Sequence, residues 1–231
     1  GMESKLFTLD EINQITKGDS IHSLMNAAFP YSDKSLVLLS NSKTRMLIDW
    51  KAKKIEWMQS CKGESSEDWS KKSRSVAFVK DDNLFITNAE GKTSQLTTDG
   101  SHNIVYGQSV HRDEFGIYKG TFWSNDGSLL AFYRMDQSMV PDYPQVDIDT
   151  RIATLEPEKY PMAGETSHKV TIGIYQVKSG KTIYLKAGDP TDRYFTNITW
   201  SPDDKKIYVI ELNRDQTDEE LVCYDASTGE K

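Results

Sequence analysis

The stretch "WSNDGSLLAFY" (residues 123–133) shows how this chain is built. It begins with an aromatic residue, continues with a polar turn and ends in an apolar run. Asn, Asp and Gly accept the tight backbone geometry of a turn, and the apolar run suits a buried strand. The pattern therefore predicts a turn followed by a strand that starts at Leu129.

The same unit recurs at three other places along the chain. They are "FPYSDKSLVLLS" (29–40), "WSKKSRSVAFV" (69–79) and "WSPDDKKIYVI" (200–210). The first strand residues of the four units are Leu36, Val76, Leu129 and Ile207. Their successive spacings are 40, 53 and 78 residues. A period near 40 residues is typical of a four-stranded propeller blade.

Further strand pairs follow the units, as in "NLFITNAEGKTSQLTTDG" (83–100) and "VTIGIYQVKSGKTIYL" (170–185). We therefore predict an all-β chain and favour a partial β-propeller of about four blades. The alternative is a β-sandwich built of hairpins. A propeller closes into a ring to remove its edge strands, so four units make at most half of one. We expect residues 1–231 to be one partial domain that stops within a blade, with Gly1 as a residue left by tag removal.

Composition excludes several classes of function. The net charge of −7 argues against nucleic acid or anionic lipid as a partner. No apolar run is long enough to predict a transmembrane segment. Cys61 and Cys223 lie far apart, and the four histidines, at 22, 102, 111 and 168, have no ligand spacing. We therefore predict no metal and no cofactor.

The longest departure from the repeat is the segment 138–169, between the third unit and its later strands. It holds four of the seven prolines. Proline lacks the N–H group that a central strand needs, so we predict an excursion from the sheet. It is either a long surface loop or an arm that contacts a partner or covers a site. Its apolar residues favour an ordered arm.

The stretch "SVHRDEFGI" (109–117) fits a strand poorly, because neither alternating face is apolar. On a helix, Val110, Asp113, Glu114 and Ile117 share one stripe. Both carboxylates could then converge on one cation, and an ammonium group with its three donors would suit them. Two alternatives stay open: the acids pair with Arg112, Lys119 or an arginine of a neighbouring blade, or they are simply solvated.

These residues also resemble a known family. The block "SVHRDEFGIYKGTFWSNDGSLLAFYRMDQSMVPDYPQVD" (109–147) resembles the N-terminal propeller of bacterial dipeptidyl peptidase IV, in the prolyl oligopeptidase family of serine peptidases. "KYPMAG" (159–164), "WSPDDKKIYVIELNR" and "YDASTGEK" are similar to later parts of that region. The resemblance implies an eight-bladed propeller above an α/β-hydrolase domain. It also implies that a short helix presents an acidic pair, here Asp113 and Glu114, to the N-terminal amine of a peptide.

What the resemblance implies for function is the release of dipeptides of the Xaa-Pro or Xaa-Ala type. The family often has Glu-Glu, and the shorter Asp113 leaves a prolyl tripeptidyl peptidase as an alternative. A non-enzymatic protein-binding propeller is another. Homodimers built through the arm and a periplasmic or cell-surface location are further implications. No G-x-S-x-G motif occurs here, so we expect the catalytic domain to be absent and this chain alone to be inert.

Overall fold

The computed structural model describes residues 4–61 and 63–231, so the expected tag residue Gly1 lies outside the described residues. The chain divides into two compact units. The first comprises residues 1–64 and 87–93, and the second comprises residues 65–86 and 94–231.

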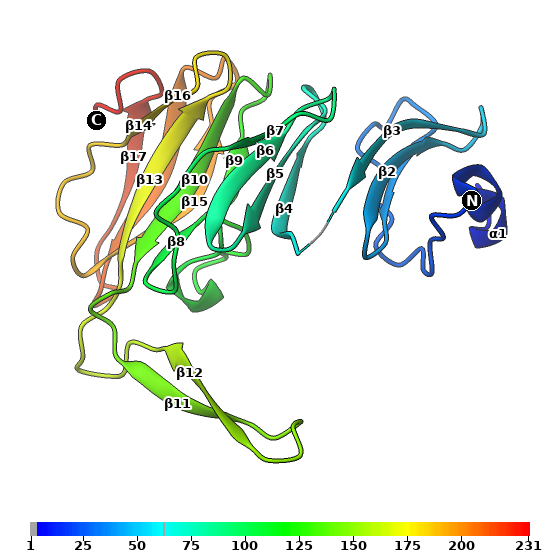
Figure 1. Cartoon of the computed structure of the whole chain (residues 1–231). Helices are drawn as coiled ribbons and strands as arrows, with labels where there is room; N and C mark the ends of the chain where they lie inside the picture. The colour runs from blue at the N-terminus through cyan, green and yellow to red at the C-terminus, as the bar shows by residue number, and fades with distance from the viewer. Residues whose placement is uncertain (1–3, 62) are drawn as a thin grey trace. The chain divides into compact units, whose positions relative to one another are not determined.

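The first unit contains one α-helix and a three-stranded antiparallel sheet (Figure 1). The elements are α1 (Leu9–Thr16), β1 (Leu36–Ser40), β2 (Thr44–Asp49) and β3 (Lys54–Ser60). Helix α1 was not among the predicted elements, although its start has a clear signal. Thr8 and Glu11 form a capping box, in which each side chain accepts a hydrogen bond from the other residue's backbone N–H. Ile12 of the helix packs with Val37 and Met46 of the sheet.

The second unit holds three further antiparallel sheets. The first has the order β4-β5-β6-β7, from β4 (Ser65–Ser70), β5 (Ser75–Lys80), β6 (Asn83–Thr87) and β7 (Thr93–Gln95). The second has the order β14-β13-β10-β8, with β9 also paired to β10. Its strands are β8 (Ile104–Tyr106), β9 (Thr121–Trp123), β10 (Leu129–Asp136), β13 (Lys169–Gln176) and β14 (Lys181–Tyr184). The third has the order β15-β16-β17, from β15 (Arg193–Trp200), β16 (Lys206–Asn213) and β17 (Glu219–Asp225).

The repeated unit behaves as the sequence predicts. Its four first-strand residues fall in β1, β5, β10 and β16, one in each of the four sheets that have three or more strands. In the third unit the Ser124 hydroxyl donates to Asp126 and accepts the N–H of Leu129, at 2.8 and 3.0 Å. In the fourth, Ser201 makes the same two bonds to Asp203 and Lys206. The Ser and Asp of the motif thus close the turn and start the strand, which confirms an all-β chain of antiparallel sheets.

The repeated tryptophans join one sheet to the next. The indole N–H of Trp123 donates to the carbonyl of Asp68, and that of Trp200 donates to the carbonyl of Phe122, both at 3.0 Å. Each acceptor is the residue just before the tryptophan of the preceding unit. The carboxylate of Asp204 adds a second link, because it accepts hydrogen bonds from Asn125 and from the N–H of Asp126. The same motif therefore serves both the turn and the contact between sheets.

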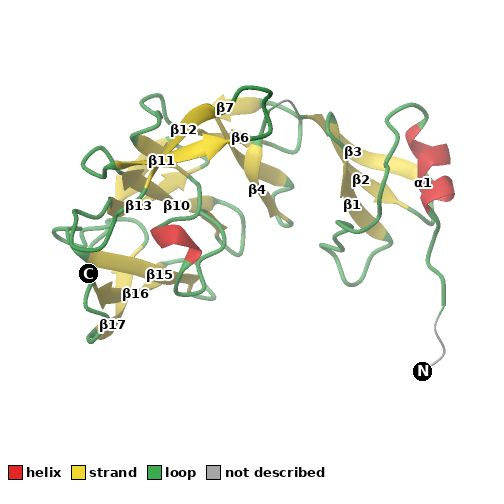
Figure 2. Ribbon diagram, turned by 90° about the horizontal axis from the view of Figure 1, so that it is seen from below, coloured by secondary structure: helices red, strands yellow, loops and turns green. Residues whose placement is uncertain are grey.

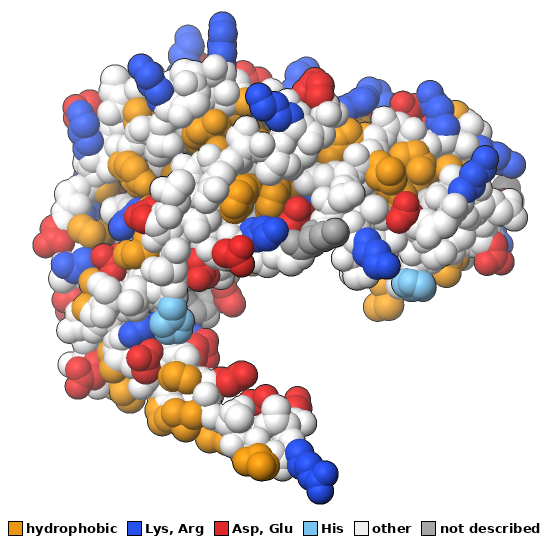
Figure 3. Space-filling model, viewed as in Figure 1, with side chains coloured by type: hydrophobic (Ala, Val, Ile, Leu, Met, Phe, Trp, Pro, Cys, Tyr) orange, Lys and Arg blue, Asp and Glu red, His pale blue; other side chains and the backbone are white. Residues whose placement is uncertain are grey.

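The proline-rich segment is an ordered arm, as predicted. β11 (Asp142–Asp147) and β12 (Thr154–Lys159) form a separate two-stranded hairpin that extends from the second unit (Figure 1). Directly paired residues share a face of the hairpin. One face carries the pairs Pro144–Pro157 and Val146–Leu155, and the other carries Tyr143–Glu158. Val146 and Leu155 are more than half exposed, and hydrophobic side chains run along the arm in Figure 3.

No helix among the described residues is long and apolar enough to cross a membrane.

Candidate functional site

Residues 107–120, which we call the site loop, interrupt an edge of the second sheet. β8 and β9 both pair with β10, at Arg134–Tyr106 and Phe132–Thr121. The residue between those two pairing sites, Tyr133, holds both ends of the loop. Its carbonyl accepts the N–H of Gly107, and its N–H donates to the carbonyl of Gly120, each at 2.9 Å. The stretch 109–117 is therefore an excursion from the sheet, as its poor strand pattern predicts.

The ends of the site loop approach each other closely. A Cβ placed on Gly120 would lie 2.0 Å from the carbonyl oxygen of Gln108, far inside van der Waals contact. Only glycine leaves room there. The two ends of the loop, at Gln108 and Gly120, therefore lie against each other, and we call this close contact the neck. The middle of the loop must reverse direction within a few residues.

The turn at the loop's centre differs from the predicted helix. It is a 3-10 helix, η1 (His111–Asp113), in which His111, Arg112 and Asp113 have left-handed φ angles of 54°, 58° and 61°. Glu114 follows in extended conformation, outside the helix, and Phe115 is left-handed again. The right-handed stripe expected over residues 110–117 is therefore wrong. The period of a sequence pattern does not determine whether the backbone turns right-handed or left-handed. A 3-10 turn is tighter than an α-helix, which suits a loop whose two ends lie against each other.

The anchors of that expected stripe are nevertheless buried, at 2% exposure for Val110 and 6% for Ile117. Left-handed backbone costs roughly 1–2 kcal/mol for each non-glycine residue. The turn has four such residues, His111, Arg112, Asp113 and Phe115. Such strain persists only where surrounding contacts fix the backbone, and it is often found at functional sites.

Those contacts come from residues far along the chain. Nδ1 of His111 lies 2.9 Å from Nε2 of His168, and Nε2 of His111 accepts the N–H of Phe195 at 3.3 Å. The hydroxyl of Thr196 donates to the carbonyl of Phe115 at 2.9 Å. The ring of Tyr194 packs on His111 and Phe115, with centroids 4.9 Å from each. Figure 2 shows the turn beside β15, the strand that carries three of these partners.

The two histidines form a buried neutral pair. Burial, reinforced by the neighbouring imidazole, lowers the pKa of His111 to about 3. Burial lowers the pKa of His168 to about 4, with Arg112 and Arg214 acting in the same direction. Because an amide N–H can only donate, Nε2 of His111 is its acceptor nitrogen. The proton of His111 is then on Nδ1 and is donated to His168. Sequence spacing missed this pair, since 57 residues separate its members.

Asp113 and Glu114 are both exposed. Within residues 4–61 and 63–231, no protein group forms a hydrogen bond or ion pair with either carboxylate. Arg112 pairs instead with Glu158 of the arm at 2.8 Å, and Lys119 pairs with Asp68 at 3.1 Å. The alternative in which Arg112 or Lys119 neutralises the acids is therefore wrong. Three alternatives stay open: solvated carboxylates, pairing with an arginine of a blade outside the described residues, and a site for an external cation.

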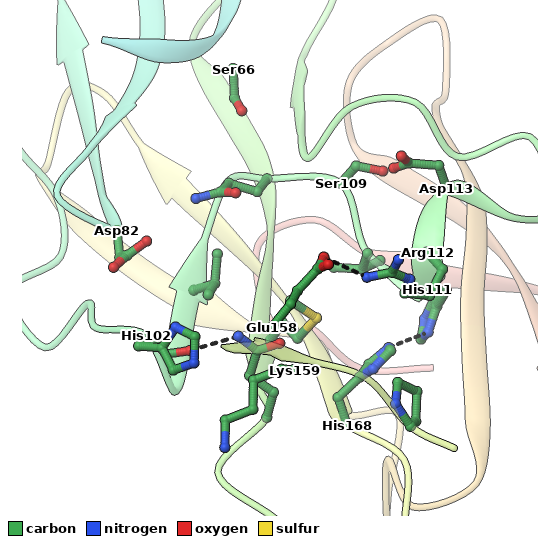
Figure 4. A pocket seen from close by; sticks show the side chains of 16 residues that line it. Ser66, Asp82, His102, Ser109, His111, Arg112, Asp113, Glu158, Lys159 and His168 are labelled. Carbon is green, nitrogen blue, oxygen red and sulfur yellow. Dashed lines mark hydrogen bonds and ion pairs between the residues drawn. The ribbon is translucent and has the colours of Figure 1, made fainter. Parts of the chain in front are cut away.

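A pocket of about 540 Å³ lies beside the turn, between the site loop and the base of the arm (Figure 4). Asp113 lines it from the loop, and Glu158 lines it from the arm. Arg112 crosses from one wall to the other, bound to Glu158 and lying 5.0 Å from the ring of Tyr160. The other polar or charged lining residues are Ser66, Asp82, His102, Gln108, Ser109, His111, Gln137, Lys159 and His168. The wall is mainly polar and suits a hydrophilic, charged ligand end rather than an apolar one.

Comparison with known proteins gives consistent matches. Residues 29–231 match the family model described as the dipeptidyl peptidase IV (DPP IV) N-terminal region. The chain is 36% identical over 176 residues to a probable dipeptidyl-aminopeptidase B of Uncinocarpus reesii, covering 68% of this chain and 19% of that protein. It is 31% identical over 183 residues to the same enzyme of Talaromyces marneffei, covering 70% and 20%.

Two solved bacterial structures are also similar. A candidate dipeptidyl aminopeptidase IV from Bacteroides ovatus has a TM-score of 0.86 and 45% identity, covering 100% of this chain and 32% of that one. Porphyromonas gingivalis dipeptidyl peptidase 4 has a TM-score of 0.68 and 26% identity, covering 87% and 29%. The chain thus spans about a fifth of the curated relatives and about a third of the solved ones.

Proposed function

This chain belongs to the family of dipeptidyl peptidase IV N-terminal regions, and from that membership we propose that the full-length protein is a serine-type dipeptidyl peptidase. The family match confirms the resemblance that the block at residues 109–147 indicates. In this proposal the enzyme releases N-terminal dipeptides of the Xaa-Pro or Xaa-Ala type. The catalytic α/β-hydrolase domain is part of the longer protein, in keeping with relatives that are about three to four times the length of this chain.

We propose that this chain gates the substrate and anchors its N-terminal amine through Glu114 and Asp113. The observation that carries the proposal is the state of the two carboxylates. They sit on a strained turn, are exposed, and have no cationic partner among the described residues. A substrate ammonium offers three donors, which suits two carboxylates that lack partners.

Anchoring of the amine also accounts for product length. If the ammonium is fixed, only a set number of residues reaches from it to the scissile bond, and two residues give a dipeptide. Asp113 is one methylene shorter than glutamate, which makes Glu114 the main amine contact in our proposal. Product analysis on one long peptide separates dipeptide release from tripeptide release.

The test is cleavage of a free-amine substrate, such as Ala-Pro-p-nitroanilide, by the full-length Glu114→Ala variant. Loss of one member of a charged, hydrogen-bonded pair costs about 2 kcal/mol or more, so kcat/KM should fall by about 30-fold or more. Asp215→Asn, at an exposed site in a turn of the same unit, is the matched control. An unchanged kcat/KM in Glu114→Ala would exclude the anchoring role. A full-length wild type that cleaves no such peptide would favour the non-enzymatic scaffold.

We also propose that the four sheets with three or more strands are consecutive blades of an eight-bladed propeller. Support comes from the repeated turn that precedes one strand of each sheet, and from the tryptophan hydrogen bonds at Asp68 and Phe122 that join three successive sheets of the second unit. A repeat that contacts only its neighbour in sequence order suits radial blades better than a sandwich of hairpins.

The proposal extends to partners and compartment. The exposed apolar face of the arm, with Val146 and Leu155, suits a homodimer contact, which sedimentation of the full-length protein would measure. We place the protein in the periplasm or at the cell surface, where extracellular peptides are accessible. Cell fractionation tests that location.

A further inference from the structure

The site loop has buried partners that the anchoring role does not itself require. His111, His168 and Thr196 are only 3%, 6% and 2% exposed, although the two histidines border the pocket. Together they hold both ends of the turn that carries the carboxylates. His111 starts the turn, and Phe115, the acceptor of the Thr196 hydroxyl, directly follows Glu114. We call these three residues the clamp.

We propose that the clamp is a positioning device that fixes Asp113 and Glu114 for a substrate ammonium, an inference that rests on the proposed anchoring function. The acids themselves are exposed and have no partner of their own among the described residues. Their positions are therefore set by the backbone on either side. Four left-handed residues make that backbone costly, and without the clamp it would relax to a commoner conformation.

The hydrogen bonds of the clamp form a chain in which each donor and acceptor can be assigned. Phe195 N–H donates to Nε2 of His111, and Nδ1–H of His111 donates to Nε2 of His168. The carbonyl of the same Phe195 accepts the hydroxyl of Tyr133, whose backbone holds the neck of the loop. The neck, the start of the turn and its end thus meet on β10 and β15. The clamp therefore requires a hydrogen-bond acceptor at the position of His168 Nε2. Variants of His168 can test that requirement.

Charged groups around the pair favour its neutral form. Arg112 from the site loop and Arg214 from the β16–β17 turn both lower the pKa of His168, although burial is the larger cause. Tyr194 and Phe195 of β15 face His111 with a ring and a backbone N–H. Protonation of His168 would place a third cation beside Arg112 and Arg214 and remove the acceptor that the clamp needs.

The test measures amine preference in the full-length protein. We define it as kcat/KM for Ala-Pro-p-nitroanilide divided by kcat/KM for the des-amino analogue, propanoyl-Pro-p-nitroanilide. His168→Leu should lower amine preference by about tenfold or more, while His168→Gln, whose amide oxygen can replace the Nε2 acceptor, should stay within about threefold of wild type. Cleavage of the des-amino analogue should change little in both. His22→Gln, at an exposed site in the first unit, is the control.

Two outcomes would overturn the proposal. One is unchanged amine preference in folded His168→Leu, and the other is an equal loss for both substrates, which would mean a purely structural role. Thr196→Val decides the matter if His168→Leu does not fold, because valine has nearly the same shape and removes only the bond to Phe115. Its amine preference should fall by about threefold, and an unchanged value would refute the clamp. A wild type that does not prefer the free amine would instead count against the anchoring function itself.

Discussion

The repeat turns and the site loop both reverse the chain direction between two strands, but they are stabilised in opposite ways. The turns at 123–129 and 200–206 each contain one left-handed residue, Gly127 and Asp204, which are residue types that tolerate it. Their Ser and Asp side chains close the turn locally. The site loop has four left-handed residues other than glycine, and its stabilising contacts come from residues far away in sequence.

This difference in the source of the stabilising contacts distinguishes the turns that build the sheets from the loop that carries the candidate site. A turn that satisfies its own polar groups can recur wherever its short motif recurs, which is why the motif predicts it. A turn that depends on distant partners can hold a conformation that its own residues do not favour. Strain of that kind fixes side chains in place while leaving them exposed. Three perturbations should separate the two regions further.

The largest effect is expected at the neck of the site loop. Gly120→Ala should lower stability by about 3 kcal/mol, because its Cβ would overlap the Gln108 backbone at 2.0 Å. Gly116→Ala is the matched control within the loop: its Cβ meets open space, and only a left-handed φ of 74° opposes it, at a cost of about 1 kcal/mol. Hydrogen exchange at amides of β10 measures both. Equal effects would show that the neck is not closely packed.

The next effect concerns pH. The folded pKa values of His111 and His168, about 3 and 4, lie below the ordinary value of 6.5. The unfolded chain therefore takes up protons first as the pH falls. Stability from the pair is complete well above pH 6.5 and decreases as the pH falls, by on the order of 2 kcal/mol between pH 6 and 5. Hydrogen exchange at β15 amides should show this slope. His168→Gln should flatten it, and His22→Gln should not; a slope that is the same in all three would contradict the buried pair.

The smallest effect belongs to a repeat turn. Asp204→Ala removes the acceptor of three hydrogen bonds from Asn125 and Asp126. Because the turn is exposed, the loss of stability should be about 1.5 kcal/mol, with Asp204→Asn retaining part of it. Amine preference should not change, since this turn supports the sheets and not the carboxylates. A fall in amine preference without a loss of stability would break the distinction between scaffold and site.

The sequence allowed much of the scaffold to be predicted. Aromatic–turn–strand motifs located one strand in each sheet, and the prolines at 138–169 located the arm. These signals succeed because they act over a few residues. The excursion that carries Asp113 and Glu114 was also predicted, since a failed strand pattern is local, while the role of the two carboxylates stays a prediction.

The structural features that were not predicted from the sequence depend on contacts between residues far apart in the chain. The handedness of the turn follows from the neck at Gly120 and the bonds to His168 and Thr196, none of which has a short-range pattern. The pairing of Arg112 with Glu158 likewise required the arm to fold back beside the loop. Helix α1 is different, because it has a local signal from which it could have been predicted. That signal is the capping box formed by Thr8 and Glu11.

The most direct test of the central claim is a crystal structure of the full-length protein with a bound free-amine dipeptide. The account predicts the ammonium nitrogen at about 2.7–2.9 Å from carboxylate oxygens of Glu114 and Asp113, the range for charge-assisted hydrogen bonds. It also predicts that the left-handed turn at 111–115 is unchanged on binding. An ammonium held by other residues, with Glu114 and Asp113 still in solvent, would contradict it.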